Sequence, residues 1–249
     1  MHPSPRVSPF GPLALGLCMS LLAWNVQAQT GEGGAIIQKG GANPAALPCM
    51  SCHGADGKGM AAGGFPRLAG LPEAYIAKQL ADFKAGRREN PLMQPIAQAL
   101  DEGEAAAVAR TYAGLPRVNV KAGPAERPRE GSGAWLALRG AWERNIPECT
   151  LCHGPAGVGV GESFPPLAGQ SAEYIEAQLR AWRGTPAQPA GRKGKAVAAQ
   201  PATRRNDPNG LMQHIAAALS EAEIKAVAAY FAGLGESTES FDQSQHRLR

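Results

Sequence analysis

The chain has 249 residues, which is enough for one large domain or two small ones, and its formal net charge of +4 is too mild to favour a nucleic-acid partner. Only 6% of its residues are aromatic, whereas 31 are glycine and 21 are proline. Two ordinary hydrophobic cores would be thin with this composition, so we expect a bound group to complete them.

Residues 1–28 have the pattern of a cleavable export signal. A short segment with Arg6 precedes an apolar run over 13–24, and Val26 and Ala28 occupy the small-residue positions that a signal peptidase requires before its cleavage site. The run is shorter than the roughly 20 residues of a membrane span. The residue before Cys18 is not the small one that a lipoprotein signal requires. We therefore expect cleavage after Ala28 and a periplasmic mature chain without a transmembrane segment, free to associate peripherally with a membrane.

Two C-x-x-C-H motifs, "CMSCH" from Cys49 and "CTLCH" from Cys149, contain all the cysteines of the mature chain. This is the pattern by which haem c is attached: both sulfurs add to vinyl groups of one porphyrin, and the histidine is aimed at the iron. A disulfide within the motif would stabilise little, a thioredoxin-like pair needs a βαβ setting, and a four-cysteine zinc site leaves both histidines unexplained. We expect two covalently bound haems, held by Cys49, Cys52, His53, Cys149, Cys152 and His153.

The chain is a tandem repeat. Segment 63–83 matches 162–182 at an offset of 99, and "NPLMQPIAQAL" matches "NGLMQHIAAAL" at an offset of 119. The change in offset places an insertion of 20 residues in the second half, at about 185–204. A stretch rich in proline, glycine and charge separates the halves and is typical of a linker. The predicted organisation is domain 1 at 31–117, a linker at 118–131, domain 2 at 132–235 and a polar tail at 236–249.

Helix signals are frequent in both halves, and strand signals are scarce. Matching capping boxes at 101–104 and 220–223 predict the start of the last helix of each half. A middle helix is predicted over about 72–85, and its twin over about 172–183. Each half is therefore expected to be a small helical domain that buries a haem as part of its core.

Several aromatic and polar side chains recur at helical spacing. In the first helix of the second half these are Trp135, Leu138 and Trp142, which we expect in the core. Two further pairs recur at matching positions of the middle helices, Tyr75 with Tyr174 and Gln79 with Gln178. Helix packing and hydrogen bonds to haem propionates are both open interpretations of these pairs.

The second axial ligand of each iron follows by exclusion. A methionine ligand raises the reduction potential and fills the iron, whereas an open position permits peroxide or oxygen chemistry. Beyond its motif the second half has one methionine, Met212, and the repeat maps it onto Met93. Met60 is a rival without a partner in the second half, and His214 is an alternative that aligns with a proline. We expect His53 with Met93 on one iron, and His153 with Met212 on the other.

These motifs resemble those of class I c-type cytochromes and, more narrowly, of the two-domain dihaem cytochrome c4 family. The likeness covers nearly all of the mature chain and rests on "CMSCHG…FPRLAG…YIAKQL…NPLMQPIAQAL" and "CTLCHG…FPPLAG…YIEAQL…NGLMQHIAAAL". It implies an all-α fold of two tandem cytochrome c-like helical domains, each around one covalently bound haem. It also implies a periplasmic carrier that passes single electrons from the quinol-oxidising complex to a terminal oxidase or other redox partners.

Two alternatives to a free carrier are also considered. The chain could be the cytochrome subunit of a periplasmic dehydrogenase complex that oxidises a sulfur compound or an alcohol. The insertion motivates this, because it is either a solvated loop or a docking surface for an acidic partner. Its basic residues are Arg183, Arg192, Lys193, Lys195, Arg204 and Arg205. A dihaem peroxidase would need one haem with an open position, and the closely matched halves argue against that asymmetry; we expect a carrier and not an enzyme.

Overall fold

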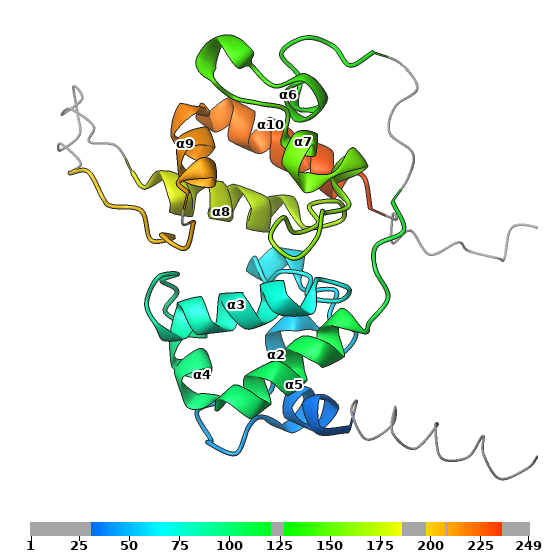
Figure 1. Cartoon of the computed structure of the whole chain (residues 1–249), viewed down its shortest axis with the longest axis vertical. Coiled ribbons are helices and arrows are strands. Elements are labelled where there is room, and N and C mark those ends of the chain that lie inside the picture. The colour runs from blue at the N-terminus through cyan, green and yellow to red at the C-terminus, as the bar shows by residue number, and fades with distance from the viewer. Residues whose placement is uncertain (1–30, 121–126, 186–197, 208, 236–249) are drawn as a thin grey trace, which may run out of the picture.

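The computed structural model describes residues 31–120, 127–185, 198–207 and 209–235. Over these residues the chain forms two helical bodies, one stacked on the other, and residues 114–120 leave the first body along one side (Figure 1). The described part contains helices and isolated β-bridges but no extended strand. The predicted all-α class with two helical domains is confirmed. The predicted signal peptide and polar tail lie outside the described residues.

The two halves repeat the same order of helices. In the first half, residues 31–39 are helical and are followed by α2 (Met50–His53), the 3-10 turn η1 (Ala61–Gly63), α3 (Glu73–Lys84), α4 (Met93–Ala99) and α5 (Glu102–Ala113). The second half contains α6 (Gly133–Arg139), η2 (Trp142–Arg144), α7 (Cys149–His153), η3 (Pro155–Gly157), α8 (Ala172–Arg183), α9 (Leu211–Ala218) and α10 (Glu221–Ala232). The middle helix α8 has the predicted bounds, and α3 is one residue shorter at each end.

Local capping sets where the last helix of each half begins. The carboxylate of Asp101 accepts a hydrogen bond of 2.8 Å from the backbone of Glu104, whose side chain accepts one of 3.0 Å in return. Ser220 and Glu223 make the same reciprocal pair at α10. Both predicted capping boxes are confirmed, because the motif satisfies backbone donors that the first helical turn leaves free.

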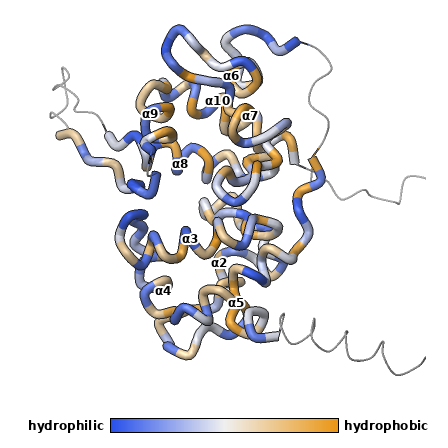
Figure 2. The backbone as a smooth tube through the Cα atoms, viewed as in Figure 1, coloured by the Kyte–Doolittle hydropathy of each residue, from blue (hydrophilic) through white to orange (hydrophobic). Residues whose placement is uncertain are grey.

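In each half the first helix crosses the last one at a glycine. A Cβ atom on Gly33 would lie 2.3 Å from the carbonyl oxygen of Ala107, and one on Gly133 would lie 1.9 Å from that of Ala226. Only a residue without a side chain permits this approach. The crossing closes a small apolar core in each half, which includes the buried Tyr112 in the first half and Phe231 in the second. Orange stretches of the tube in Figure 2 mark hydrophobic residues on these helices.

The expectation that the tryptophans of the second half are core residues is wrong for Trp142. Gly140, at φ +69°, ends α6 and turns the chain, so Trp142 lies in the short turn η2 and not on the helix. Its side chain is 60% exposed. Leu136 faces the core instead, while Trp135 and Leu138 are partly buried.

The two halves meet along α3 and α8, which face each other at the junction (Figure 1). A short antiparallel bridge pairs Arg88 with Arg204, flanked by backbone hydrogen bonds of 2.7 and 2.8 Å between the halves. Elsewhere at the junction the buried Gln170 exchanges hydrogen bonds of 2.8 and 3.1 Å with the backbone of Arg67. The halves are therefore held together by polar contacts of both backbone and side chains.

Backbone hydrogen bonds join the two ends of the insertion. Thr185 and Gln200 exchange backbone hydrogen bonds of 3.0 and 2.8 Å, and residues 186–197 lie outside the described part. Three of its basic residues have partners within the chain: Arg183 pairs with Glu221, Arg205 pairs with Glu89, and Arg204 is buried at the junction. The interpretation as part of a solvated loop or a docking surface is therefore wrong for the buried Arg204, whereas Arg205 remains exposed in its ion pair. Arg192, Lys193 and Lys195 lie outside the described residues.

Candidate haem sites

The two motif histidines are buried and held in one orientation. Nδ1 of His53 lies 2.9 Å from the carbonyl oxygen of Pro66, and Nδ1 of His153 lies 2.8 Å from that of Pro165. A carbonyl oxygen only accepts, so each Nδ1 carries the proton and each Nε2 keeps its lone pair. Burial lowers the pKa of both rings below the ordinary value, which keeps them neutral. Both imidazoles are thereby prepared to bind a metal through Nε2.

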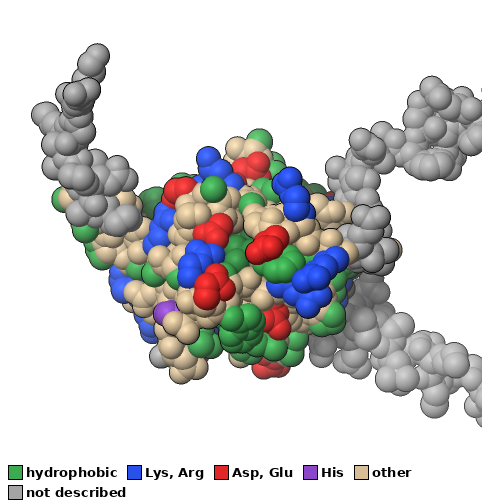
Figure 3. All heavy atoms as spheres, turned by 90° about the horizontal axis from the view of Figure 1, so that it is seen from above, with side chains coloured by type: hydrophobic (Ala, Val, Ile, Leu, Met, Phe, Trp, Pro, Cys, Tyr) green, Lys and Arg blue, Asp and Glu red, His purple; other side chains and the backbone are tan. Residues whose placement is uncertain are grey.

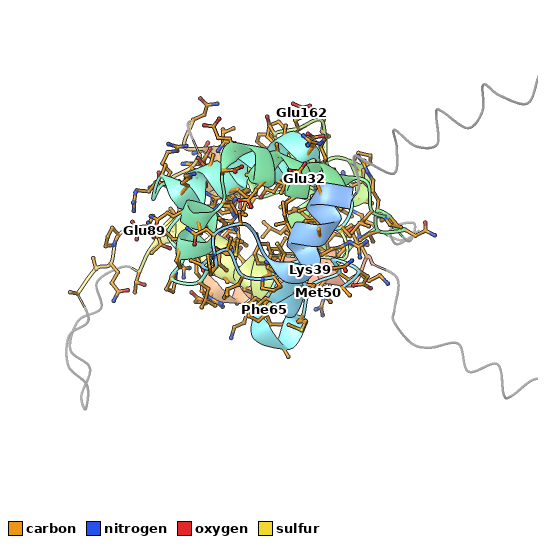
Figure 4. All side chains as sticks on the ribbon, turned by 90° about the horizontal axis from the view of Figure 1, so that it is seen from below. Glu32, Lys39, Met50, Phe65, Glu89 and Glu162 are labelled. Atoms are coloured by element: carbon orange, nitrogen blue, oxygen red, sulfur yellow. The ribbon has the colours of Figure 1, made fainter. Side chains whose placement is uncertain are left out.

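A phenylalanine edge packs against each of these rings. The ring centroids of His53 and Phe65 are 6.3 Å apart, and those of His153 and Phe164 are 6.2 Å apart. Phe65 and Met50 lie near each other at one edge of the first half, and Glu89 lies away from both (Figure 4). The matching contacts show that the two histidine environments are built alike.

The first cysteine of each motif is a thiol that burial keeps protonated. All four motif cysteines are free and partly buried, on the short helical turn that also carries the histidine. Burial raises the pKa of Cys149 to about 12 and also raises that of Cys49. Redox-active C-x-x-C pairs instead have a lowered thiol pKa. The site thus favours attachment of a group by both sulfurs over dithiol redox chemistry.

The candidate methionines occupy equivalent places. Met93 begins α4 and Met212 is the second residue of α9, and both are partly buried. The backbone N–H of Met93 donates to Asn90 Oδ1 at 2.9 Å, and that of Met212 donates to Asp207 Oδ2 at 2.6 Å. A side chain just upstream therefore fixes the backbone of each methionine.

The two rival ligands lie elsewhere. His214 is exposed, and its Nε2 lies 3.3 Å from the carbonyl oxygen of Asn145, to which it donates. Met60 is 41% exposed, in a turn that bridges to Phe65. The structure thus gives both rivals surface positions, whereas Met93 and Met212 are partly buried.

Two buried arginines meet at the junction. Arg88 and Arg204 are 7% and 5% exposed. Arg88 donates to Gln79, Tyr174 and Gln178 at 2.7 to 2.9 Å, and Arg204 donates to Gln178, Gln79 and Tyr75 at 2.9 to 3.3 Å. These are the Tyr and Gln pairs that the repeat singled out, and each arginine contacts both halves. Neither guanidinium has an ion pair with a carboxylate among the described residues.

This pair of charges points to a missing anion. A buried charge without a counter-charge is costly, and two like charges side by side cost more. Burial, and then the charge of Arg88, lower the pKa of Arg204. For Arg88 the effect of burial is outweighed by Tyr174, Tyr75 and the nearby carboxylate of Asp82, which raise its pKa. Asp82 is already paired with Lys78 and Arg87, so it does not neutralise the two arginines as well. The indole Nε1 of Trp182, whose ring lies 3.7 Å below the Arg204 guanidinium, is a buried donor without a partner in the described part of the chain.

These features fit a haem in each half. Its vinyl groups would take the two thiols, its iron would take the histidine Nε2, and its propionates would supply the negative charge that Arg88 and Arg204 lack. The sequence predicted the cysteines, histidines and methionines as haem-binding residues, and these assignments remain predictions. Sequence reasoning missed the orienting carbonyls of Pro66 and Pro165 as well as the buried arginine pair, because the proline carbonyls carry no side-chain signal and the arginines looked like surface charges.

Comparisons with known proteins identify the family of the chain. A family model for cytochrome c matches residues 38–113 and 145–235. A thiosulfate dehydrogenase electron acceptor from Stutzerimonas stutzeri (strain A1501) is 55% identical over 225 residues, covering 90% of this chain and 95% of the relative. None of the helices over the described residues has the length and apolarity needed to cross a bilayer.

Two solved structures have the same fold. Reduced recombinant cytochrome c4 from Pseudomonas stutzeri superimposes with a TM-score of 0.63 at 30% identity, covering 83% of this chain and 98% of that one. A thiosulfate dehydrogenase, TsdBA from Marichromatium purpuratum, superimposes with a TM-score of 0.65 at 40% identity. The match covers 82% of this chain but only 40% of that longer chain.

Proposed function

The chain belongs to the cytochrome c family, among the cytochrome c4-like electron carriers, and on that premise we propose that it binds two haems and accepts electrons from a thiosulfate-oxidising dehydrogenase. The observation that carries the haem count is the matched pair of buried histidines, each with Nδ1 bonded to a proline carbonyl and Nε2 left free. Each half has its own cysteine pair and its own methionine in an equivalent position.

Haem c, when bound, supplies a one-electron couple at its iron. The residues of the chain hold and tune it. His53 and His153 bind through Nε2, and their Nδ1 bonds to backbone carbonyls fix each ring and make it a better donor. Met93 and Met212 would supply the second ligand to each iron, which would leave no position for peroxide, so in this proposal the chain acts as a carrier and not as an enzyme. Buried aliphatic side chains exclude water and favour the reduced state.

The proposed partner rests on the relatives. The acceptor from Stutzerimonas stutzeri matches this chain over 95% of its length, and the solved TsdBA chain contains a part like this one. Both support the dehydrogenase alternative over a carrier between a quinol-oxidising complex and an oxidase. The export signal predicted at residues 1–28 places the reaction in the periplasm in this proposal.

Rapid mixing tests the proposal. Oxidised holoprotein is combined with the thiosulfate dehydrogenase of Stutzerimonas stutzeri and thiosulfate, and the haem absorbance is followed. We expect reduction of two haems per chain, counted independently by pyridine haemochrome. A single haem per chain, or no reduction beyond the rate with thiosulfate alone, would refute the corresponding part of the proposal.

A further inference from the structure

We propose that the loop 141–146 of the second half, with Trp142 at its tip, is the surface on which the electron-donating dehydrogenase docks. This inference rests on the proposed function and assigns the entry point of electrons to the second half. The transfer moves one electron from the reduced donor to the second site and makes or breaks no bond.

Trp142 is the largest of the apolar side chains that the second half exposes, a group that also includes Leu151 and Leu211. Its side chain is 60% exposed, although backbone hydrogen bonds hold the two ends of its loop together. Ala141 and Ile146 exchange backbone hydrogen bonds of 2.7 and 3.1 Å, and Ile146 is fully buried. A tryptophan on a rigid loop loses little conformational entropy when a partner covers it, which is why this residue type dominates binding energy at protein interfaces.

The loop lies between the two elements that carry the candidate axial ligands of the second site. It leads directly into α7, which holds His153, and it is fastened to α9, which holds Met212. The fastening consists of the hydrogen bond from His214 to Asn145, and of Arg144, which donates to the carbonyl oxygen of Ala218 at 3.3 Å. A partner seated on Trp142 would therefore approach the second site at the edge between its two ligand-bearing elements.

A groove of about 390 Å³ lies beside the exposed indole. Trp135 and Trp142 both line it, and Arg127 lies over the Trp135 ring at 5.5 Å. An apolar side chain of a partner could enter this groove while Trp142 packs against the surface around it. Two aromatic residues that line one groove resemble the central cluster of a protein interface and not a scattered surface residue.

The first half lacks this surface although its loop is built alike. Ala42 occupies the place of Trp142, and Pro44 that of Arg144. Its fastening is a hydrogen bond of 2.6 Å from the Ala42 backbone to Glu104, the capping residue of α5. The scaffold is thus common to both halves, and only the second presents a large apolar side chain at the tip.

Charges around the groove largely cancel. Arg144 pairs with Glu223 and lies 3.7 Å from Glu143, which leaves Arg139 and Glu130 of opposite sign on the same groove. Figure 3 views the second half from above and shows hydrophobic side chains among adjoining basic and acidic ones. We therefore expect a donor whose contact surface has an apolar centre and little net charge, with association that depends weakly on salt.

Replacing Trp142 with alanine tests the inference, because alanine is the residue at the matching position of the first half. The second-order rate constant for reduction of the holoprotein by thiosulfate-reduced Stutzerimonas stutzeri dehydrogenase should fall about tenfold or more, since a central tryptophan typically contributes more than 1 kcal/mol. W142F should recover part of the rate. Reduction by dithionite and the two haem potentials should stay unchanged, which excludes a damaged site.

Leu47→Ala is the matched control, because Leu47 is 57% exposed in the first half. Its rate should equal that of the unchanged protein. A W142A rate equal to that of the unchanged protein would overturn the docking surface and leave the proposed function standing. If the unchanged protein is itself not reduced by the dehydrogenase, the proposed function fails and the inference falls with it.

Discussion

The two halves share their interior and differ on their surface. Both cross their first and last helices at a glycine, orient a histidine by a proline carbonyl, and open the last helix with a capping box. Near the motifs, however, the first half shows the ion pair of Asp56 with Lys58 at 3.1 Å. The second half shows the exposed Leu151 and Val158 instead. The requirements of holding a haem limit the interior, whereas each surface is free to suit its own partner.

The junction between the halves is also nearly symmetric, with one difference between its two arginines. Arg88 and Arg204 stack on aromatic rings of their own halves, Phe83 at 4.5 Å and Trp182 at 3.7 Å, and both bond to polar groups of the other half. The symmetry is not complete, because the ring of Trp182 has an N–H group that can donate a hydrogen bond, whereas the ring of Phe83 has none. The two sites are therefore expected to have related but unequal potentials.

Removing a candidate methionine ligand should have the largest effect on a haem potential. Each substitution should change the haem of one half only. Met93→Ala or Met212→Ala should lower the potential of one haem by on the order of 0.1–0.2 V and let that iron bind carbon monoxide. Optical redox titration with and without carbon monoxide measures both. Met60→Ala, which changes an exposed methionine, is the control. Unchanged titrations in both ligand variants would show that the assignment is wrong.

The next largest effect should come from the junction and should reach both halves. Arg88→Gln removes a buried positive charge that disfavours the oxidised haems. Both potentials should fall by about 60 mV, which corresponds to 1.4 kcal/mol for one electron. The exposed Arg110→Gln serves as the control in the same redox titration. A fall confined to one haem would contradict a charge shared across the junction.

A smaller effect should come from the ion pair between Arg144 and Glu223, which should make the stability of the fold depend on pH. The hydrogen bond from Arg144 lowers the pKa of Glu223 to about 2 from an ordinary 4.5. A carboxyl whose folded pKa is depressed stabilises the fold above its unfolded pKa, and this contribution is lost as the pH falls from about 4.5 towards 2. Glu223→Gln, which keeps a capping oxygen, should melt a few degrees lower at about pH 6. The difference should shrink below about pH 4 in thermal melts followed by circular dichroism.

The pH dependence has a built-in comparison. Pro44 stands in the place of Arg144 in the first half, so Glu104 has no such partner there. The ion pair that carries this pH dependence is therefore a feature of the second half. An E223Q melting curve that stays parallel to that of the unchanged protein down to about pH 2 would contradict the assigned pair.

The smallest effect should come from shortening the insertion that only the second half contains. Thr185 and Gln200 already form a bridge, so an Asn-Gly turn can replace residues 186–199 without moving Arg204. The potentials should stay unchanged and the melting temperature should move by no more than about 2 °C. A marked loss of reduction by the dehydrogenase at low salt would instead make the basic insertion the docking surface.

The sequence by itself determined what depends on neighbours along the chain. The spacing of Cys49, Cys52 and His53 on one helical turn, the capping boxes, and the middle helices all follow from residues within a few positions of one another. The repeat added the pairing of Met93 with Met212, because the one methionine of the second half aligns with Met93 and not with the other methionines of the first half. These local and internal relations were sufficient for the fold class and for the candidate ligands.

Only the tertiary structure decided whether several other side chains are buried or exposed. A single glycine, Gly140, turned Trp142 from an expected core residue into an exposed one. The packing of the two halves buried Arg204, which the sequence had grouped with a basic loop. The carbonyl of Pro66 became the partner of His53 through a contact across 13 positions. Burial and hydrogen-bond partners depend on segments brought together from distant parts of the chain, and no local pattern of residues encodes them.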